Sequence, residues 1–280
     1  MEKAIRISVL MAVHNRWEMT HEILDNLQIS SSEIDLCLHI VDDGSSDATS
    51  KSLSQYPKVR YQRGDGNLFW AKAMKLAQDS VVDPVDYYLW LNNDVKLSAD
   101  FFARILESVK NHPNTILVGQ TSDSISGLIS YGGYKRIGRH PHRFKNVQAE
   151  SDYEEADTFC GNIVLIPTSI NRDLGGIDGE FEHGYADHDF GYRAKRMGYS
   201  IRVIPGFLGS CSRNPNALKN QNRLQAFKLI LSKKYLPWRS QIRFCKRHGG
   251  PEWILYVVSP YLRTLFGLRQ YKVSEIDSGF

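Results

Sequence analysis

The stretch LCLHIVDDGS, residues 36–45, changes within two residues from apolar to acidic and small side chains. Its apolar part predicts a buried β-strand, and Asp-Asp-Gly-Ser is typical of a turn where a strand ends. A similar apolar run, Ile5–Val13, precedes it, and apolar side chains recur at helical spacing between Trp17 and Leu27. A strand, a helix and a second strand in this order form the repeating unit of a parallel sheet.

The same alternation continues to about residue 120. Further strands are predicted at residues 59–62, 87–91 and 115–119, and further helices toward Tyr56, at 68–79 and at 100–110. We therefore predict an α/β fold, Rossmann-like, with a mostly parallel sheet and helices on both faces.

The pattern loosens beyond that point. Residues 122–157 are rich in Gly, Ser, His and Arg, and later strands are predicted at 163–167 and 201–205, with a helix at about 187–197 between them. Beyond Ser210 the chain becomes helical and basic. Five Arg and His side chains of this region either meet a phosphate group of an acceptor or face water: Arg136, Arg139, His140, His142 and Arg143.

Polar clusters follow four of the predicted strands. They occupy residues 12–16 (AVHNR), 42–47 (DDGSSD), 63–67 (RGDGN) and 92–94 (NND). A single cluster of this kind is most simply a turn. In an open parallel sheet, however, the carboxyl ends of the strands share one edge, and ligands bind beyond that edge. Four clusters at one edge therefore indicate a binding site.

The residue types indicate the kind of ligand. Asp42 and Asp43 are hydrogen-bond acceptors suited to a nucleobase or a ribose. A diphosphate needs a cation, and a hard divalent cation prefers oxygen ligands. Asp94, directly after an apolar strand, is the best single candidate for such a ligand; a helix or turn cap is the competing interpretation.

A fifth cluster lies far downstream, at residues 182–193 (EHGYADHDFGYR). Asp187 and Asp189 stand at the start of a predicted helix. Either they complement the helix dipole, or one of them is a general base that deprotonates a hydroxyl. Arg193 is predicted to pair with Asp189 one turn earlier. His183 and His188 are ligands, acceptor contacts or simply exposed side chains.

Taken in order, these clusters resemble the family 2 glycosyltransferases of the GT-A fold. SVLMAVHNR at 8–16 resembles the opening strand and turn of that family, and VDDGSSD at 41–47 resembles its nucleotide-binding turn. Asn92-Asn93-Asp94 stands at the Asp-x-Asp metal position. Asp187-x-Asp189, with Arg193 and Gly198, resembles the segment that carries the general base. The resemblance covers roughly residues 5–210.

The resemblance implies a role for individual residues. Asp187 would take the proton from an acceptor hydroxyl in an inverting transfer, and Asp94 would bind Mn²⁺ or Mg²⁺ that stabilises the departing nucleoside diphosphate. Trp70 either faces the sugar or belongs to the core. Donor contacts are expected from Ala12, His14, Arg16, Asp42, Asp43, Gly44, Asp65, Gly66, Asn67, Trp70, Asn92 and Asn93. Supporting or acceptor contacts are expected from His183, Asp189, Arg193 and Arg213.

We accordingly expect a GT-A catalytic domain at residues 1–215, with a nucleotide-sugar half at about 1–120 and an acceptor half at about 121–215. Residues 216–280 would form a helical, basic C-terminal region. The expected activity is sugar transfer from a dTDP- or UDP-linked donor to a saccharide or lipid-linked saccharide, in bacterial surface polysaccharide synthesis. Asn-Asn-Asp at 92–94 is similar to rhamnosyltransferase-like members that use a dTDP donor.

Two positions depart from the family pattern. Asn92 replaces the first Asp of Asp-x-Asp, which predicts a weaker metal site or a second ligand from water or phosphate. Ala186 replaces the usual acidic residue before Asp187. These departures are the only support for a non-catalytic sugar-binding protein on the same fold. A sugar-nucleotide nucleotidyltransferase and a dehydrogenase are both disfavoured, because no Gly-rich phosphate loop follows the first strand.

The composition is 42% hydrophobic and 24% charged, as in ordinary globular proteins, and the net charge of +4 is too small to indicate nucleic-acid binding. The four cysteines lack a CxxC spacing, which disfavours zinc sites and disulfides and suits a reducing compartment. The sequence shows no basic-then-apolar signal segment and no run of roughly 20 apolar residues. We expect a cytoplasmic protein.

The C-terminal region has its own pattern. From Asn222 onward, the sequence has eleven Lys and Arg and three acidic residues. The net charge is therefore about +8 for this part and about −4 for the remainder. Within it, residues 253–266 (WILYVVSPYLRTLF) are apolar and aromatic. The region either packs on the catalytic domain or on a second copy, or makes peripheral contact with the inner face of a membrane.

Overall fold

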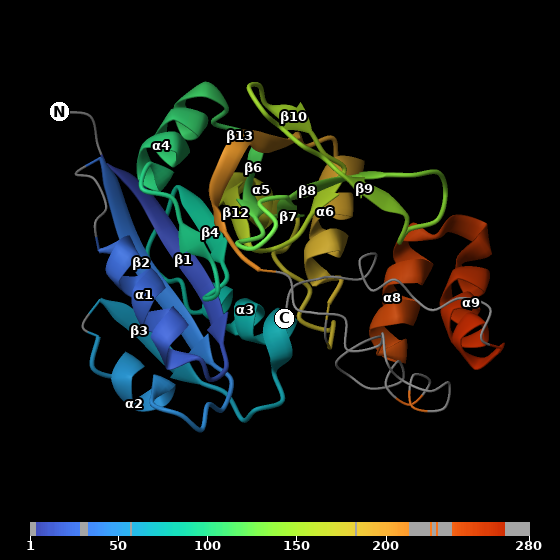
Figure 1. The fold of residues 1–280 in the computed structure, drawn as a ribbon, viewed down its shortest axis with the longest axis horizontal. Helices are drawn as coiled ribbons and strands as arrows, with labels where there is room; N and C mark the ends of the chain where they lie inside the picture. The colour runs from blue at the N-terminus through green and yellow to red at the C-terminus, as the bar shows by residue number, and fades with distance from the viewer. Residues whose placement is uncertain are drawn as a thin grey trace.

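The computed structural model describes residues 4–28, 33–56, 58–182, 184–212 and 237–266, together with residues 225 and 228. A ten-stranded mixed sheet forms its centre (Figure 1), in the order β10-β13-β6-β12-β4-β1-β2-β3, with β5 paired to β13 and β7 to β6. The strands of this sheet are β1 (Ile5–Val13), β2 (Ile34–Asp42), β3 (Val59–Arg63), β4 (Tyr87–Leu91), β5 (Lys96–Leu97), β6 (Ile116–Ser122), β7 (Ile129–Tyr131), β10 (Glu154–Glu155), β12 (Ile163–Pro167) and β13 (Ile201–Ser210).

The half of the sheet built from β3, β2, β1 and β4 is entirely parallel. Val13 pairs with Asp42, and Asp42 pairs with Arg63, so the three strands end at the same level. On the other side of β1, Leu10 pairs with Trp90, one residue before the end of β4. The four polar clusters therefore lie at one edge of the sheet, as the strand order predicts.

Helices cover both faces of the sheet, which confirms the predicted layers. One face carries α1 (Trp17–Leu27), α2 (Thr49–Leu53) and α4 (Phe101–Asn111), and the other carries α3 (Phe69–Asp79), α5 (Thr168–Asp173) and α6 (Ala186–Arg196). Val9 and Met11 enter the first of these two cores, whereas Leu10 and Ala12 enter the second. Because successive strand residues point to opposite faces and both faces are covered, β1 is apolar from Val9 to its end at Val13.

The region at 122–157 contains more structure than its composition predicts. Besides β7 and β10, it holds β8 (Gly133–Arg136) and β9 (Phe144–Asn146), which join β11 (Thr158–Phe159) in a separate three-stranded sheet. The strand β12 runs antiparallel to both of its neighbours, β4 and β6, so the sheet is mixed at this point. Strands of two to four residues are too short to show a periodic apolar pattern.

The C-terminal part of the described chain forms a helical hairpin of α8 (Trp238–His248) and α9 (Trp253–Phe266), joined by the short helix η1 (Gly250–Glu252). It lies at the opposite end of the molecule from β2 and β3 (Figure 1). Phe244 of α8 is fully buried in the core that α3 and α6 share. Among the described residues, no helix combines the length and apolarity that crossing a membrane requires.

Candidate functional site

The turns after β1 and β2 are tied together at the sheet edge. His14 Nδ1 lies 2.7 Å from the backbone oxygen of Asp43, and the amide of Asn15 donates to Ser45 Oγ at 2.6 Å. Asn15 and Arg16 have φ angles of 59° and 62°, so the chain leaves β1 through a left-handed turn. This turn holds the exposed side chains of His14 and Arg16 at the edge.

Asp43 organises the loop after β3. Its carboxylate accepts hydrogen bonds from the backbone amides of Gly66 (2.9 Å), Leu68 (3.1 Å) and Phe69 (2.8 Å). Phe69 itself has a φ of 53°, which a non-glycine residue adopts only when its surroundings hold it there. Asp43 therefore shapes the start of α3, and most of its acceptor capacity is used by the protein.

Asp42 is fully buried and retains more acceptor capacity. It accepts bonds from the Ser45 amide (2.9 Å) and the Tyr61 hydroxyl (3.3 Å), whereas a carboxylate offers about four acceptor positions. The neighbouring Gly44, with a φ of 71°, lies against Gly66, and a Cβ on Gly44 would come within 2.8 Å of the Gly66 nitrogen. Only glycine fits at this close approach of two loops.

Trp70 and Asn92 connect α3 to the end of β4. The indole Nε1 donates to Asn92 Oδ1 at 3.0 Å, and Asn92 Nδ2 donates to Asn162 Oδ1 at 2.9 Å. The ring packs on Gly161, where an added Cβ would lie 2.5 Å from ring carbon Cζ2. Trp70 is only 5% exposed, so its ring forms a wall of the core beneath the edge.

Asn93 and Asp94 point in different directions. Asn93 Nδ2 donates to Thr20 of α1 at 2.9 Å. Asp94 Oδ2 lies 3.4 Å from Arg16 Nη1, while Asp94 Oδ1 is buried and accepts no bond from an oxygen or nitrogen donor in the described chain. The Cys211 thiol, a weak donor, lies beside it, and burial together with the Asp94 charge raises the pKa of that thiol.

An acceptor oxygen that is buried without a strong donor is chemically suited to a cation. The described residues contain no cluster of three or more His, Cys, Asp or Glu side chains that could hold a metal ion. Asp94 would thus supply a single carboxylate. Mg²⁺ is commonly held by one or two carboxylates together with the phosphates of a substrate. The residues present therefore fit a divalent cation that binds together with a diphosphate.

Asp187 stands in the first turn of α6 and is 4% exposed. Its Oδ2 accepts a bond from the Gly161 amide at 3.0 Å, and its Oδ1 accepts one from the His188 amide at 2.8 Å. Gly161 also contacts Trp70, which in turn bonds Asn92. The carboxylate of Asp187 is therefore joined by a short chain of contacts to the strand end that carries Asp94.

Asp189, two residues further along α6, is fully buried and bound from three sides. It accepts bonds from Arg193 Nε (2.8 Å), Arg247 Nη1 (2.7 Å) and His248 Nε2 (2.8 Å). Burial alone would raise the pKa of Asp189, but the bond to His248 and the two arginine charges outweigh it and lower that pKa. The predicted pairing of Arg193 with Asp189 is confirmed, and it forms part of a link between α6 and α8.

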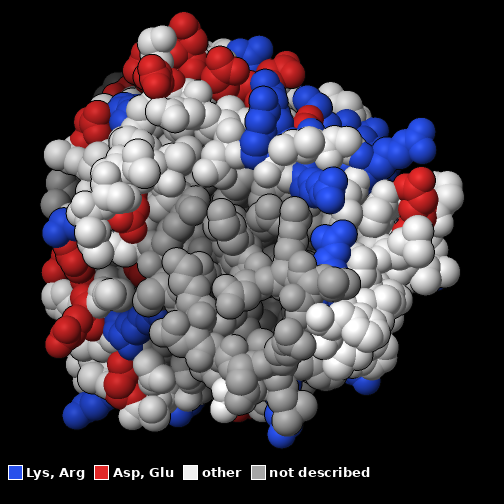
Figure 2. Space-filling view, turned by 45° about the vertical axis from the view of Figure 1, so that its right-hand side comes forward, with Lys and Arg blue, Asp and Glu red and all other residues white. Residues whose placement is uncertain are grey.

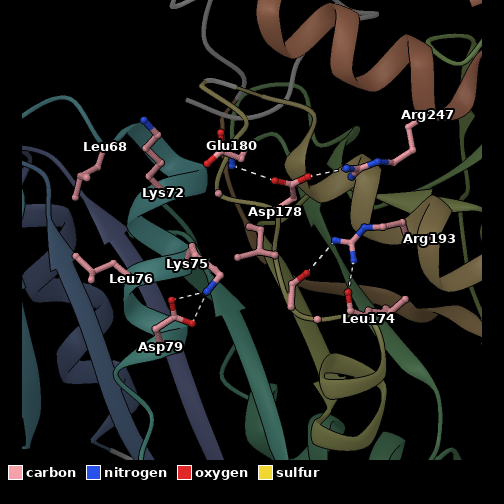
Figure 3. Close-up of a pocket in the computed structure, with 14 residues that line it drawn as sticks. Leu68, Lys72, Lys75, Leu76, Asp79, Leu174, Asp178, Glu180, Arg193 and Arg247 are labelled. Atoms are coloured by element: carbon pink, nitrogen blue, oxygen red, sulfur yellow. Dashed lines mark hydrogen bonds and ion pairs between the residues drawn. The ribbon is translucent and has the colours of Figure 1, made fainter.

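A pocket of about 710 Å³ lies beside this link, between α3 and the loop at 174–180 (Figure 3). Arg193 and Arg247 line it, with Arg193 donating to the backbone oxygens of Leu174 (2.6 Å) and Gly176 (2.9 Å). Figure 3 also shows Asp178 pointing toward Arg247, to which it is bonded. The pocket contains neither the predicted base nor the predicted metal ligand, so the edge of the sheet remains the candidate site.

The remaining predicted residues fall into three groups. Ala12 is buried at the end of β1, and Asp65, Gly66 and Asn67 are exposed in the loop after β3. His188, whose role the sequence leaves open, is buried, with its ring 4.8 Å from Phe144. His183 and Arg213 lie outside the described residues.

Several residues that complete this arrangement are absent from the sequence-based prediction. They are Tyr61, Gly161, Asn162, Arg247 and His248. The segment TFCGN at 158–162 carries a signal that sequence reasoning could have used, because a Gly-Asn pair directly before the strand 163–167 is turn chemistry at a sheet edge. Arg247 and His248 carry no comparable signal in the sequence.

Comparisons with known proteins indicate the family and the fold of the chain. The sequence model of the family described as Glycosyl transferase family 2 matches residues 8–175. No match was found in a search of curated protein sequences.

Solved structures with similar folds include residues 1–349 of TarS from S. aureus, with 12% identity, a TM-score of 0.59 and coverage of 96% of this chain and 74% of that one. The same TarS fragment in complex with UDP-GlcNAc gives 11% identity, a TM-score of 0.60, and 96% and 75% coverage. GalNAc-T7 with UDP, GalNAc and Mn²⁺ gives 10% identity, a TM-score of 0.61, and 92% and 55% coverage, so this chain spans little more than half of that one. At such identities the likeness shows the fold alone.

Proposed function

The chain belongs to glycosyl transferase family 2 and is a glycosyltransferase with a GT-A fold; from this premise we propose an inverting transfer from a dTDP- or UDP-linked sugar to an acceptor hydroxyl. The contact chain from Asp187 through Gly161 and Trp70 to Asn92 carries the proposal. It links Asp187, the candidate base, to the end of β4, where Asp94 can ligate a cation. A metal-assisted transferase needs a base and a cation in one site.

In the proposed reaction the acceptor hydroxyl loses its proton to Asp187 while its oxygen attacks the anomeric carbon. The new carbon–oxygen bond forms as the bond to the diphosphate breaks, and the nucleoside diphosphate departs from the opposite face. The amides of Gly161 and His188 hold the Asp187 carboxylate in place, one on each oxygen. Each oxygen keeps acceptor capacity for the incoming proton.

The donor would lie across the edge of the sheet. Asp42 has free acceptor capacity for a pyrimidine N–H or a ribose hydroxyl, and Gly44 and Gly66 let the loops after β2 and β3 pack closely beside it. The exposed Arg16, beside Asp94, is suited to a diphosphate. Two of the similar structures contain UDP or UDP-GlcNAc, which supports a pyrimidine nucleotide for this chain as well.

Asp94 is the residue that would hold Mn²⁺ or Mg²⁺. A divalent cation there supplies electrostatic stabilisation of the charge on a departing diphosphate. The similar structure of GalNAc-T7 contains Mn²⁺, which supports a divalent metal for this fold. A saccharide or lipid-linked saccharide acceptor, and a role in bacterial surface polysaccharide synthesis, are carried over from the resemblance of Asn92-Asn93-Asp94 to rhamnosyltransferase-like members.

A donor panel tests the proposal. Nucleoside diphosphate release and thermal shift are measured with dTDP- and UDP-sugars, with and without Mn²⁺ or Mg²⁺. A true donor at 100 times its dissociation constant adds about 2.7 kcal/mol to the free energy of unfolding. We expect nucleoside diphosphate release with at least one donor, and a strong loss of this release in Asp94→Asn. The control is Asp152→Asn, which changes an exposed carboxylate far along the chain and should leave the release unchanged. Binding of a sugar without any release would favour the non-catalytic alternative.

A further inference from the structure

Helix α9 exposes large apolar side chains along one face. At about 100° per residue these side chains fall within an arc of about 120°, and they extend for about 18 Å along the helix. They are between 42% and 66% exposed, and we call them the α9 stripe: Ile254, Leu255, Val258, Leu262, Leu265 and Phe266. A continuous apolar helix face of this kind indicates an interaction surface.

The other side of α9 accounts for its attachment to the protein. Pro260 is buried, and Gln241 of α8 donates to the backbone oxygen of Tyr256 at 3.1 Å. The stripe is therefore not the surface by which α9 packs on α8. Within α9, Arg263 is the single charged residue and no carboxylate occurs. Its 14 residues span about 21 Å, which is too short to cross a bilayer core of about 30 Å.

Cations converge on α9 from the hairpin of β8 and β9. The segment GYKRIGRHPHRFKN, residues 133–146, contains five Lys and Arg and no carboxylate. Its His140 ring lies 4.4 Å from the Tyr256 ring, and Arg139, 88% exposed, lies 3.7 Å from Glu252 of η1, directly before α9. Burial lowers the pKa of His140 to about 4, and the charges of Arg143, Arg263 and Arg136 add to this shift.

The surface view agrees with this arrangement. In Figure 2 several Lys and Arg side chains gather at the upper right of the molecule, next to white surface at the right. An apolar helix face bordered by cations is the pattern of helices that lie in the plane of an anionic membrane surface, where apolar burial and electrostatic attraction act together.

We propose that the α9 stripe and the cationic hairpin at 133–146 bind the surface of an anionic lipid bilayer, with α9 lying at the boundary between headgroups and acyl chains. The charge complementarity favours a lipid surface over a second copy of this chain, because an anionic surface complements the five cations of the hairpin, whereas a second copy presents the same cations. The inference goes beyond the proposed function and is independent of the donor chemistry.

The test uses the full-length protein and vesicles, with no donor present. Flotation is measured with vesicles of phosphatidylcholine alone and with vesicles containing about 30% phosphatidylglycerol, at low and at high salt. We expect binding to the anionic vesicles that weakens in high salt and with neutral lipid. Leu255→Glu with Leu262→Glu should lower the partition coefficient more than about tenfold. Val82→Glu, which changes a side chain that is 75% exposed between α3 and β4, should leave it unchanged.

A second variant keeps the test valid if the first pair disturbs folding. Arg139→Gln with Arg143→Gln retains the α9 stripe and should lower the partition coefficient about fivefold for each cation. Circular dichroism and the thermal midpoint report folding of every variant. Absence of flotation by the wild type, or equal flotation of the wild type and both variants, would overturn the inference. So would a stripe-dependent dimer in sedimentation velocity without vesicle binding.

Discussion

The link between α6 and α8 makes a strong prediction for Asp189→Asn. The substitution preserves the size of the side chain but removes the charge that Arg193, Arg247 and His248 surround. Removing one partner of a buried ion pair typically costs about 3–5 kcal/mol. Both arginines keep other partners, since Arg193 bonds two backbone oxygens and Arg247 bonds Asp178, so we take the lower end, about 3 kcal/mol.

The assay is urea unfolding at pH 7, with thermal unfolding as a second measure. A loss of about 3 kcal/mol corresponds to a fall of roughly 5 °C in the thermal midpoint of a protein of this size. The matched control is Asp83→Asn, which breaks the exposed pair between Arg60 and Asp83 and should cost no more than about 1 kcal/mol.

The pH dependence provides an independent check on the same residue. The pKa of Asp189 is lowered in the folded state, so its contribution to stability is present above the unfolded pKa of about 3.9 and is lost as the pH falls through the folded pKa. The difference between wild type and Asp189→Asn should therefore shrink below pH 4. A difference below about 0.5 kcal/mol at pH 7, or one that grows in acid, would refute the argument.

Three further predictions concern other parts of the molecule. Burial lowers the pKa of His39 and of His140 to about 4. The stability that each neutral ring contributes should therefore be complete above about pH 6.5 and be lost as the pH falls toward 4. Urea unfolding between pH 7 and pH 4 would measure this loss. Gly161→Ala would force a Cβ to within 2.5 Å of the Trp70 ring and should lower turnover at least about tenfold, with a smaller effect on donor affinity measured by thermal shift. Asp94→Ala should abolish the dependence of donor binding on Mn²⁺, which titration calorimetry with and without the metal would detect.

The sheet and the edge of the site follow closely from the sequence because they depend on local patterns. The predicted bounds of β1, β4 and β12 agree with those of the structure, since each is a mainly apolar segment that ends abruptly in polar residues. Both faces of these strands are covered, so burial favours apolar residues at most positions. The order of strand and helix then suffices to bring the four polar clusters to one edge.

The parts that escaped prediction depend on long-range contacts. Nothing in the local pattern indicates that β12 runs antiparallel between β4 and β6, because an apolar run is the same in either direction. The roles of Arg247 and His248 arise because α8 folds back onto α6, nearly 60 residues from Asp189. Trp70 illustrates a different limit, since its position at a helix start suits either the core or a ligand, and only the bond to Asn92 and the contact with Gly161 distinguish the two.

The central claim is that Asp187 acts as the general base of a sugar transfer at the edge of the sheet. The most direct measurement compares turnover and donor affinity of the wild type with those of Asp187→Asn, using the donor identified by the panel and a saturating acceptor. Loss of a general base typically costs about 10²–10⁴ in rate, so turnover should fall at least about 100-fold while the donor dissociation constant changes by less than about twofold. Turnover within about tenfold of the wild type would contradict the account.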